Sequence, residues 1–333
     1  MAKCLVTGGA GFIGSHVVDE LIKLSSEVIV LDDLSGGFKE NVNKKAIFVE
    51  GDVGNHALVN KLFKENKFDY IYHLAAYAAE NLSHFIKRFN YNNNLIGSIN
   101  LINASVNNDV KCFVFTSSIA VYGANQVPMT EDLVPKPEDS YGIAKYTVEQ
   151  ELKICHEVFG LNYIIFRPHN LYGERQNMGD KYRNVLAIFM NQLLNGEAMT
   201  IFGDGEQKRA FTYVGDVVPV IARAPLVKEA YNEVFNIGAD KPYTVNQIAE
   251  YIAEAMNVEK KVKYLPARKE VRNAFSEHNK ARTILRYNDK MHLKDGINKM
   301  VKWAIKQGVK QSKKFDNIEV MKNMPEHWLK DFF

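Results

Sequence analysis

Short, almost continuously apolar segments alternate with helical segments through the first half of this chain. The apolar segments span residues 3–7, 28–31, 46–50, 70–75, 111–117 and 163–167. Between them, residues 13–24, 56–66, 83–107 and 141–159 carry apolar side chains at helical spacing. Continuously apolar strands are typical of parallel sheets buried on both faces, and the alternation indicates βαβ units. The pattern therefore predicts an α/β fold with a doubly wound parallel sheet, in which ligands bind along one edge.

A glycine-rich turn follows the first apolar segment. Gly8 permits a tight turn, Gly11 lets backbone amides approach a pyrophosphate, and Gly14 allows the next helix to pack closely on the strand. Asp32 ends the second strand 18 residues after Gly14, where a carboxylate accepts ribose hydroxyls and repels a 2′-phosphate. These residues predict a Rossmann sheet that binds NAD rather than NADP, although such a turn and acid can also serve only the fold. Asp52 fits either a contact with the adenine or a simple turn.

The alternation breaks after residue 168, where a second structural unit begins. Residues 183–194 have helical spacing, 200–202 form a strand and 203–205 a turn. Residues 234–237 resemble one more buried strand, Thr244 is placed to cap a helix that runs to residue 256, and 293–305 form an amphipathic helix. We predict an NAD-binding Rossmann domain over residues 1–168, with 211–238 returning to it, a smaller, discontinuous C-terminal substrate domain over 169–210 and 239–310, and a tail over 311–333.

Composition excludes several classes of protein. The net charge of +3 is too small to indicate a nucleic-acid or membrane partner, and the lysines on helix 293–305 are typical of a solvated face. Cys4, Cys112 and Cys155 lie far apart in apolar stretches, which indicates buried thiols rather than disulfides or a metal site. No apolar run reaches membrane-spanning length, and the first strand begins too early to leave room for a signal peptide. We expect a cytoplasmic protein without a metal.

Tyr141 and Lys145 lie four residues apart, so a helix places them on one face. A phenol is a poor base at neutral pH, and a neighbouring cation favours its phenolate. Ser140 is placed to cap this helix. Ser118 follows the fifth strand at the ligand-binding edge, where its hydroxyl could share a substrate oxygen with Tyr141 or bond only to its own turn. With NAD nearby, these residues predict an enzyme that acts on alcohols and ketones.

Six motifs carry a resemblance to a known family. They are TGGAGFIG at 7–14, HLAA at 73–76, SSIAVYG at 117–123, YGIAK at 141–145, RPHNLYG at 167–173 and GDGEQKRAFTYV at 203–214. With these motifs the chain resembles extended short-chain dehydrogenases/reductases, and it is especially similar to nucleotide-sugar epimerases of the UDP-glucose 4-epimerase type, from residue 3 to about residue 305.

The resemblance implies a role for each matching residue. Tyr141 would be the acid/base, Lys145 its electrostatic partner and ribose anchor, and Ser118 the residue that aligns the hydroxyl being oxidised. Tyr141 and Lys145 would line NAD together with Gly8, Gly11, Phe12, Ile13, Gly14, Asp32, Asp33, Asp52, Val53, Leu74, Ala75, Ala76 and Asn93. Asn170, Arg209 and Arg268 would hold the diphosphate and base of a nucleotide-sugar substrate. Without the resemblance, each arginine would be interpreted as part of a surface or structural ion pair.

Positions at which the chain differs from related enzymes reduce the number of reactions to consider. Where the 4,6-dehydratases carry an acid after this serine or threonine, the chain has Ile119 and Ala120, and the extra Cys or His of 3,5-epimerising relatives is missing. His169, a position often aromatic in relatives, either contacts substrate or packs in the core. A small residue near Ala274 would admit an N-acetyl group.

We therefore expect a UDP-sugar 4-epimerase of the UDP-glucose/UDP-galactose type, which oxidises C4 transiently with tightly bound NAD. The alternative is another nucleotide-sugar oxidoreductase or epimerase: a 4-ketoreductase, a 2-epimerase, or a 4-epimerase of UDP-glucuronate or UDP-N-acetylhexosamine. A regulatory protein that senses NAD and a purely structural protein are further hypotheses, disfavoured by the Tyr, Lys and Ser. By analogy with the fold, helices 83–107 and 141–159 would pair in a homodimer.

Overall fold

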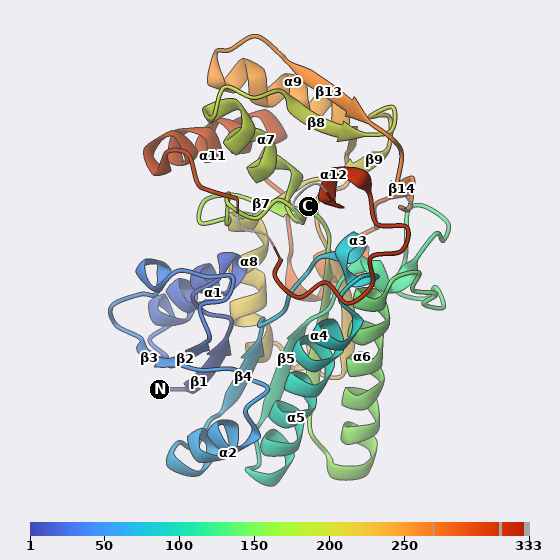
Figure 1. Ribbon diagram of the computed structural model, residues 1–333. Coiled ribbons are helices and arrows are strands. Elements are labelled where there is room, and N and C mark those ends of the chain that lie inside the picture. The colour runs from blue at the N-terminus through green and yellow to red at the C-terminus, as the bar shows by residue number, and fades with distance from the viewer. Residues whose placement is uncertain (269, 313–314, 330–333) are drawn as a thin grey trace.

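A seven-stranded parallel sheet forms the centre of the part of the chain described, residues 1–268, 270–312 and 315–329, in a computed structural model (Figure 1). The strand order is β11-β6-β5-β4-β1-β2-β3, with every neighbouring pair parallel. The strands are β1 (Lys3–Thr7), β2 (Glu27–Asp32), β3 (Ile47–Glu50), β4 (Tyr70–His73), β5 (Cys112–Thr116), β6 (Tyr163–Pro168) and β11 (Glu233–Ile237). The predicted fold class is confirmed.

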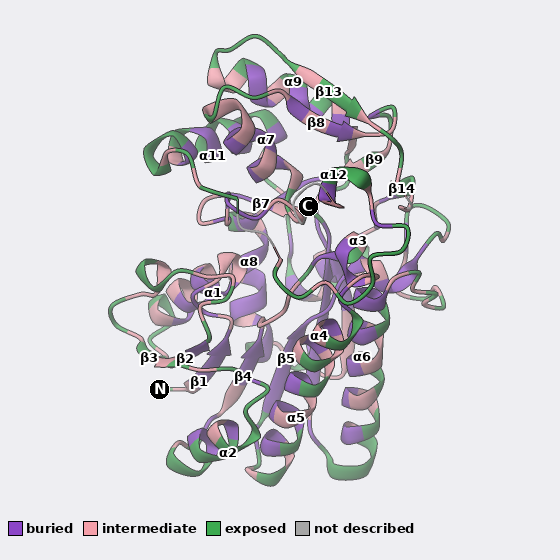
Figure 2. Cartoon of the chain, viewed as in Figure 1, coloured by how far each residue is buried: buried purple, intermediate pink, exposed green. Residues whose placement is uncertain are grey.

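Helices cover both faces of this sheet, which explains why its strands are apolar without interruption. Val6 and Val30 pack in the core under α1 (Phe12–Lys23), α8 (Val214–Arg223) and α10 (Asn279–Leu285). Leu5 and Ile29, one residue earlier in each strand, pack on the opposite face under α2 (His56–Glu65), α5 (Gly97–Asn107) and α6 (Ser140–Phe159). Because successive side chains of a strand point to opposite faces, both sets must be hydrophobic. Figure 2 shows the inner strands mostly buried, whereas the edge strand β3 has no buried residue.

The helix predicted over residues 83–107 is broken near its start. The structure has α3 (Glu80–Ser83), α4 (Lys87–Tyr91), a π turn (Asn92–Ile96) and α5 in succession. The backbone leaves the helix at Ile86, where φ is −134°. The C-terminal segment docks at this break: Glu319 accepts hydrogen bonds from the N–H groups of Arg88 and Phe89 at 2.7 and 2.9 Å, and its own N–H donates to the carbonyl of Phe85.

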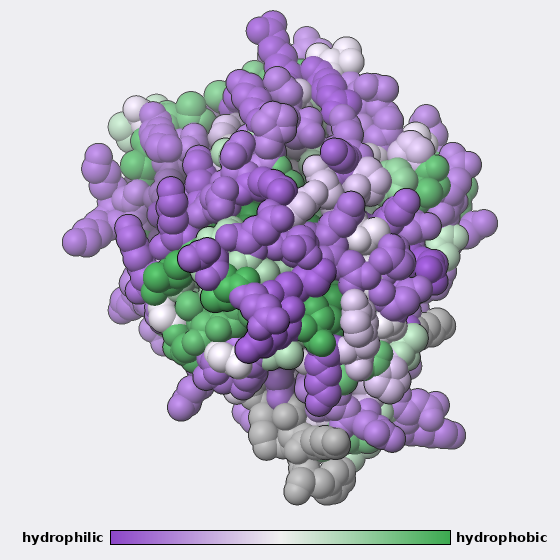
Figure 3. Space-filling model, turned by 90° about the horizontal axis from the view of Figure 1, so that it is seen from above, coloured by the Kyte–Doolittle hydropathy of each residue, from purple (hydrophilic) through white to green (hydrophobic). Residues whose placement is uncertain are grey.

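A second group of helices surrounds a separate hydrophobic core. It contains α7 (Val185–Leu194), α9 (Val245–Met256), α11 (Leu293–Gln307) and the parallel pair β8 (Met199–Phe202) and β13 (Val262–Leu265). Thr244 begins α9 with a complete capping box, as its position predicted. Figure 3 shows that the face seen from above is largely hydrophilic. This separate core is the basis on which we propose the two-domain division given above.

Shorter elements connect the two units. Strand β9 (Lys208–Ala210) lies between β12 (Pro242–Thr244) and β14 (Asn273–Ala274), and β7 (Leu171–Tyr172) pairs with β10 (Thr212–Tyr213). Single 3-10 turns occur at Lys39–Asn41, Ile119–Tyr122, Ala224–Leu226 and Lys228–Ala230.

The C-terminal segment crosses from one unit to the other (Figure 1). Phe315 packs against Tyr77 and Phe89 of the first unit, with ring centroids 5.4 and 4.9 Å away. Trp328, in the short helix α12 (Glu326–Leu329), is only 2% exposed and packs against Tyr182 at 5.3 Å. The segment therefore holds the two units together through aromatic contacts on both sides.

The three cysteines are free and buried, as predicted. Burial raises the pKa of the Cys4 thiol to about 12, so it stays protonated at neutral pH. Among the described helices, none has both the length and the apolar composition needed to cross a membrane.

Candidate active site

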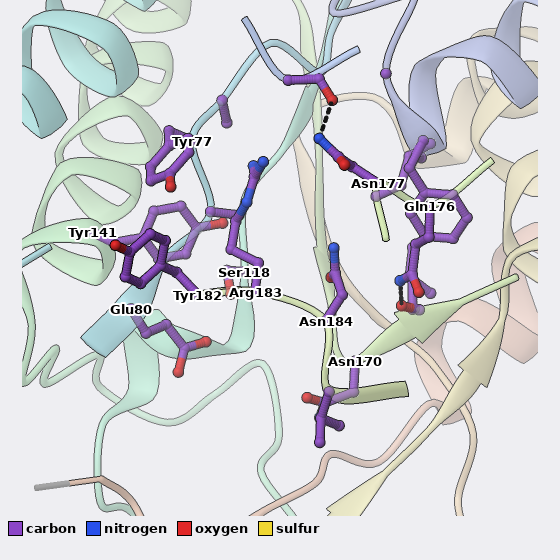
Figure 4. A pocket seen from close by; sticks show the side chains of 18 of the residues that line it. Tyr77, Glu80, Ser118, Tyr141, Asn170, Gln176, Asn177, Tyr182, Arg183 and Asn184 are labelled. Atoms are coloured by element: carbon purple, nitrogen blue, oxygen red, sulfur yellow. Dashed lines mark hydrogen bonds between the residues drawn. The ribbon is translucent and has the colours of Figure 1, made fainter. Parts of the chain in front are cut away.

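A cavity of about 460 Å³ opens at the carboxyl ends of the parallel strands (Figure 4). Its walls come from the glycine turn, the ends of β2, β4 and β5, the start of α6 and the second unit. Every residue predicted for the cofactor or the substrate lines this cavity: Gly8, Gly11, Phe12, Ile13, Gly14, Asp32, Asp33, Asp52, Val53, Leu74, Ala75, Ala76, Asn93, Ser118, Tyr141, Lys145, Asn170, Arg209 and Arg268. The fold thus brings together side chains from the whole length of the chain.

The glycine turn forms an uncapped helix start that suits a pyrophosphate. Gly8 has a φ of +71°, a conformation that glycine adopts readily. Gly11 precedes α1 without a side-chain cap, so the first amides of the helix face the cavity unblocked by a side chain. A Cβ on Gly14 would lie 2.1 Å from the Gly8 carbonyl oxygen, so only glycine fits there. The turn fits the diphosphate of a dinucleotide.

Asp32 ends β2 and lines the cavity. Its two carboxylate oxygens accept hydrogen bonds from the N–H groups of Ala10 and Leu34, at 2.9 and 2.8 Å. Burial raises its pKa, while these hydrogen bonds oppose the rise. Since each ionised carboxylate oxygen accepts about two hydrogen bonds, both keep capacity for ribose hydroxyls.

The remaining acids at this end are held by turns. Asp33 accepts from the N–H of Ser35 at 2.9 Å, and Asp52 accepts from the N–H of Gly54 at 2.7 Å. Asp52 therefore acts as a turn residue and lines the cavity at the same time. The hydroxyl of Thr116, also on the wall, is buried without a hydrogen-bond partner among the described residues. An unsatisfied buried hydroxyl at this place fits a cavity built to receive a polar ligand.

Gly14→Ala tests the glycine turn. The clash with the Gly8 carbonyl forces the turn or α1 to move, so we expect a melting temperature several degrees lower and NAD affinity at least about tenfold weaker. Calorimetry and the nucleotide content of the purified protein measure the two effects. Gly160→Ala is the control, because a Cβ there would meet nothing within 4 Å and its φ of +75° makes it a test of backbone strain alone. NAD content lost equally in both variants would contradict the prediction.

Tyr141 and Lys145 lie on one face of α6, close to the end of β5. The Lys145 ammonium donates to the Thr116 carbonyl at 2.8 Å and lies 5.8 Å from the centre of the Tyr141 ring. Asp139, not Ser140, caps this helix: its carboxylate accepts from the N–H of Gly142 at 2.7 Å. The predicted cap was wrong by one residue, because the backbone is extended at Asp139 and already helical at Ser140.

Ser118 is a turn residue that also lines the cavity. Its hydroxyl accepts from the N–H of Ala120 at 3.1 Å, as a turn serine does, and it is close enough to Tyr141 to influence the pKa of that phenol. The following residues, Ile119 and Ala120, bring no ionisable group, as the sequence shows.

The electrostatics of the tyrosine differ from the expectation. Burial, followed by the negative charge of nearby Glu80, raises the pKa of Tyr141, and the neighbouring Ser118 hydroxyl only partly offsets this rise. Burial lowers the pKa of Lys145 to about 7, against the attraction of Glu149. The expected stabilisation of the phenolate by Lys145 is therefore outweighed by burial, which disfavours the charged form of both groups.

A buried ion pair fixes the helix that carries these residues. Arg167 of β6 binds both carboxylate oxygens of Glu149 in α6, at 3.0 and 2.5 Å. Glu149 also accepts from the hydroxyl of Ser117 at 2.5 Å. This network ties α6 to β5 and β6, so the face that presents Tyr141 is held against the sheet.

The two predicted arginines lie in the wall, but both are engaged. Arg209 donates to the carbonyls of Lys208 and Arg272 at 2.9 and 2.8 Å. Arg268 pairs with Glu270 at 3.2 Å and stacks over Phe202 at 4.3 Å. These contacts fit the structural interpretation of each arginine, and both side chains also line the cavity.

His169 is packed rather than exposed to the cavity. It is 2% exposed, with Nδ1 3.0 Å from the Ala210 carbonyl and Nε2 3.0 Å from Nε2 of His278. Burial lowers its pKa to about 3, so it is neutral. Together with Ala274 it lines a small hollow next to the main cavity.

Several wall residues were not predicted from the sequence. Glu80, Gln176, Asn177, Arg183 and Asn184 all line the cavity (Figure 4). Four of them belong to the segment between β7 and α7, which has no periodic pattern. The only available signal was a cluster of amide and charged side chains just after a strand at the ligand-binding edge.

The fold and the site together define an NAD-dependent enzyme built on a Rossmann sheet. The model of the NAD dependent epimerase/dehydratase family matches residues 4–238, and the chain belongs to this family. It is 37% identical to a putative UDP-glucose 4-epimerase of Methanocaldococcus jannaschii over 90% of this chain and 97% of the relative.

Solved structures agree with this assignment. The UDP-glucose 4-epimerase of Thermotoga maritima with UDP-glucose has a TM-score of 0.88 and 39% identity, over 92% of this chain and 99% of that one. The UDP-glucose 4-epimerase of Thermus thermophilus with NAD has a TM-score of 0.86 and 30% identity, over 91% and 99%. Other relatives are 4-epimerases of UDP-N-acetylglucosamine or UDP-glucuronic acid, or decarboxylases. The enzyme class and the NAD cofactor are thus established, and the sugar is not.

Proposed function

We propose that this protein is a UDP-sugar 4-epimerase that interconverts UDP-glucose and UDP-galactose. The main support for the proposal is that Ser118, Tyr141 and Lys145 line the same cavity as the glycine turn. The apolar Ile119 and Ala120 beside Ser118 support an epimerase over a dehydratase. The relatives named above as UDP-glucose 4-epimerases support the UDP-hexose.

The proposed roles follow from the geometry. When bound, NAD supplies a hydride acceptor and a positive charge in the cavity. Ser118, which lines the cavity with Tyr141, would align the 4-hydroxyl of the sugar. Tyr141 would take the proton from this hydroxyl as the 4-keto sugar forms and return it when the opposite epimer forms. Lys145 would anchor the nicotinamide ribose, and Asn170, Arg209 and Arg268 the uridine diphosphate. The enclosed cavity would keep water from the 4-keto sugar.

We further propose that the protein is a cytoplasmic homodimer. Large apolar side chains remain exposed along the helices expected to pair: Ile96 (48%), Ile143 (42%), Ile154 (51%), Val158 (63%) and Phe159 (63%). A second copy that packs against these helices would cover them.

Incubation with a panel of UDP-, GDP-, CDP- and dTDP-sugars, followed by identification of the products, tests the function. We expect purified protein to carry NAD detectable by absorbance and to interconvert UDP-glucose and UDP-galactose without net redox change. Absence of turnover with every 4-epimer pair would rule out the proposal. Decarboxylation of UDP-glucuronate, or a net oxidation, would instead support the alternative enzyme class.

A further inference from the structure

Glu80 places a carboxylate next to the reacting groups. It is the first residue of α3, and it lines the main cavity with Ser118 and Tyr141 as well as the adjoining hollow with Ile119 and Asn170. Figure 4 shows its side chain extending into this space. Its negative charge is close enough to raise the pKa of Tyr141. Glu80 is exposed, and the surface it exposes belongs to the cavity.

No side chain or backbone group among the described residues hydrogen-bonds to the Glu80 carboxylate or forms an ion pair with it. The charged groups that face it are all engaged elsewhere. Asp139 caps α6, Arg209 donates to backbone carbonyls, and Arg268 pairs with Glu270. Desolvation by the surrounding protein raises the pKa of Glu80 above its usual range, although the positive charges of the two arginines lower it. The carboxylate is thus unpaired and open to the cavity, where a bound ligand can hydrogen-bond to it.

We propose that Glu80 selects the sugar: its carboxylate accepts a hydrogen bond from a hydroxyl of a neutral hexose and repels sugars that carry a carboxylate. This inference rests on the proposed 4-epimerase function and narrows its substrate class. One hydrogen bond from a sugar hydroxyl to a charged acceptor raises the affinity of the enzyme for that sugar about ten- to a hundredfold. A uronic acid in the same place sets two negative charges close together in an enclosed site, so it binds only if one of them is protonated.

Glu80→Gln tests the selection, because glutamine keeps the shape and removes the charge. We expect kcat/KM for UDP-glucose to fall about tenfold or more, and the ratio of kcat/KM for UDP-glucuronate to that for UDP-glucose to rise at least about tenfold. Glu138→Gln is the matched control. It removes the same charge from an exposed glutamate that accepts from the N–H of Ala124 and does not line the cavity, so the ratio should stay unchanged. NAD content and melting temperature report whether the variants fold.

Three results would overturn the proposal. One is a wild-type enzyme that turns over UDP-glucuronate as efficiently as UDP-glucose. A second is an unchanged substrate ratio in Glu80→Gln, or in Glu80→Ala if the first variant fails to fold. A third is complete loss of turnover in Glu80→Gln with unchanged affinity for every UDP-sugar, which would assign the carboxylate to proton transfer. Wild-type protein inactive on all nucleotide sugars would refute the 4-epimerase function itself, so the two failures are distinguishable.

Discussion

Replacement of Tyr141 by phenylalanine is expected to lower kcat by about a thousandfold while the purified protein keeps its NAD. The variant loses the phenolic hydroxyl that is proposed to exchange a proton with the sugar in the cavity that Ser118 also lines. The ring is 5% exposed and packs at the start of α6, so phenylalanine fills the same space and stability should change little. Steady-state kinetics with UDP-galactose and the absorbance of bound nucleotide measure the two quantities.

Tyr146→Phe on the same helix is the matched control. Tyr146 is half-buried and does not line the cavity, so its variant should keep nearly the full rate. A Tyr141→Phe enzyme as fast as the control would remove Tyr141 from the mechanism. If the slow variant also lost its NAD, the defect would lie in cofactor binding, and the role assigned to the phenol would be wrong.

The sheet could be predicted almost to the residue because its signal is local. Strand β1 occupies the predicted residues 3–7, since a parallel strand covered on both faces needs an unbroken apolar run. The break at Ile86 could not be predicted, because the contact with Glu319 that accompanies it joins residues more than 200 positions apart in sequence. The choice between Asp139 and Ser140 as helix cap was equally hidden. Both residue types cap helices well, and the backbone angles that decide between them depend on the loop before α6.

The site was predicted in its geometry and only partly in its electrostatics. The spacing of Tyr141 and Lys145 places them on one helical face in any fold. Whether a cation lowers the pKa of a phenol depends on how deeply both are buried, and burial is a property of the assembled cavity. Glu80 escaped prediction for a related reason. One glutamate at the start of a four-residue helix carries no pattern, and its importance arises only from the unpaired position it occupies beside Ser118.

Lys145→Met is expected to make the protein more stable at pH 6 and nearly inactive. Burial lowers the pKa of Lys145 from 10.5 to about 7, which corresponds to roughly 5 kcal/mol of unfavourable burial of the charged form. Methionine removes this cost but gives up the hydrogen bond to the Thr116 carbonyl, about 1–3 kcal/mol, so we expect a net gain of about 2–4 kcal/mol. Loss of the cation that would hold the ribose and assist Tyr141 should lower kcat/KM by about a hundredfold or more.

The pH dependence of this gain separates the buried lysine from a general packing effect. Between pH 7 and 10.5 the unfolded chain keeps the Lys145 proton that the folded protein has released, so the free energy of unfolding of the wild type rises with pH across this window. The methionine variant lacks this contribution. Its advantage should therefore be largest below pH 7 and should disappear as the pH approaches 10. Urea titrations of nucleotide-free protein at pH 6 and pH 9 measure the difference.

Lys153→Met, on the same helix but half-buried and away from the cavity, should show no such dependence. A constant difference between the wild type and Lys145→Met at both pH values would show that Lys145 remains charged in the folded protein, and the role of burial in setting its pKa would have to be abandoned.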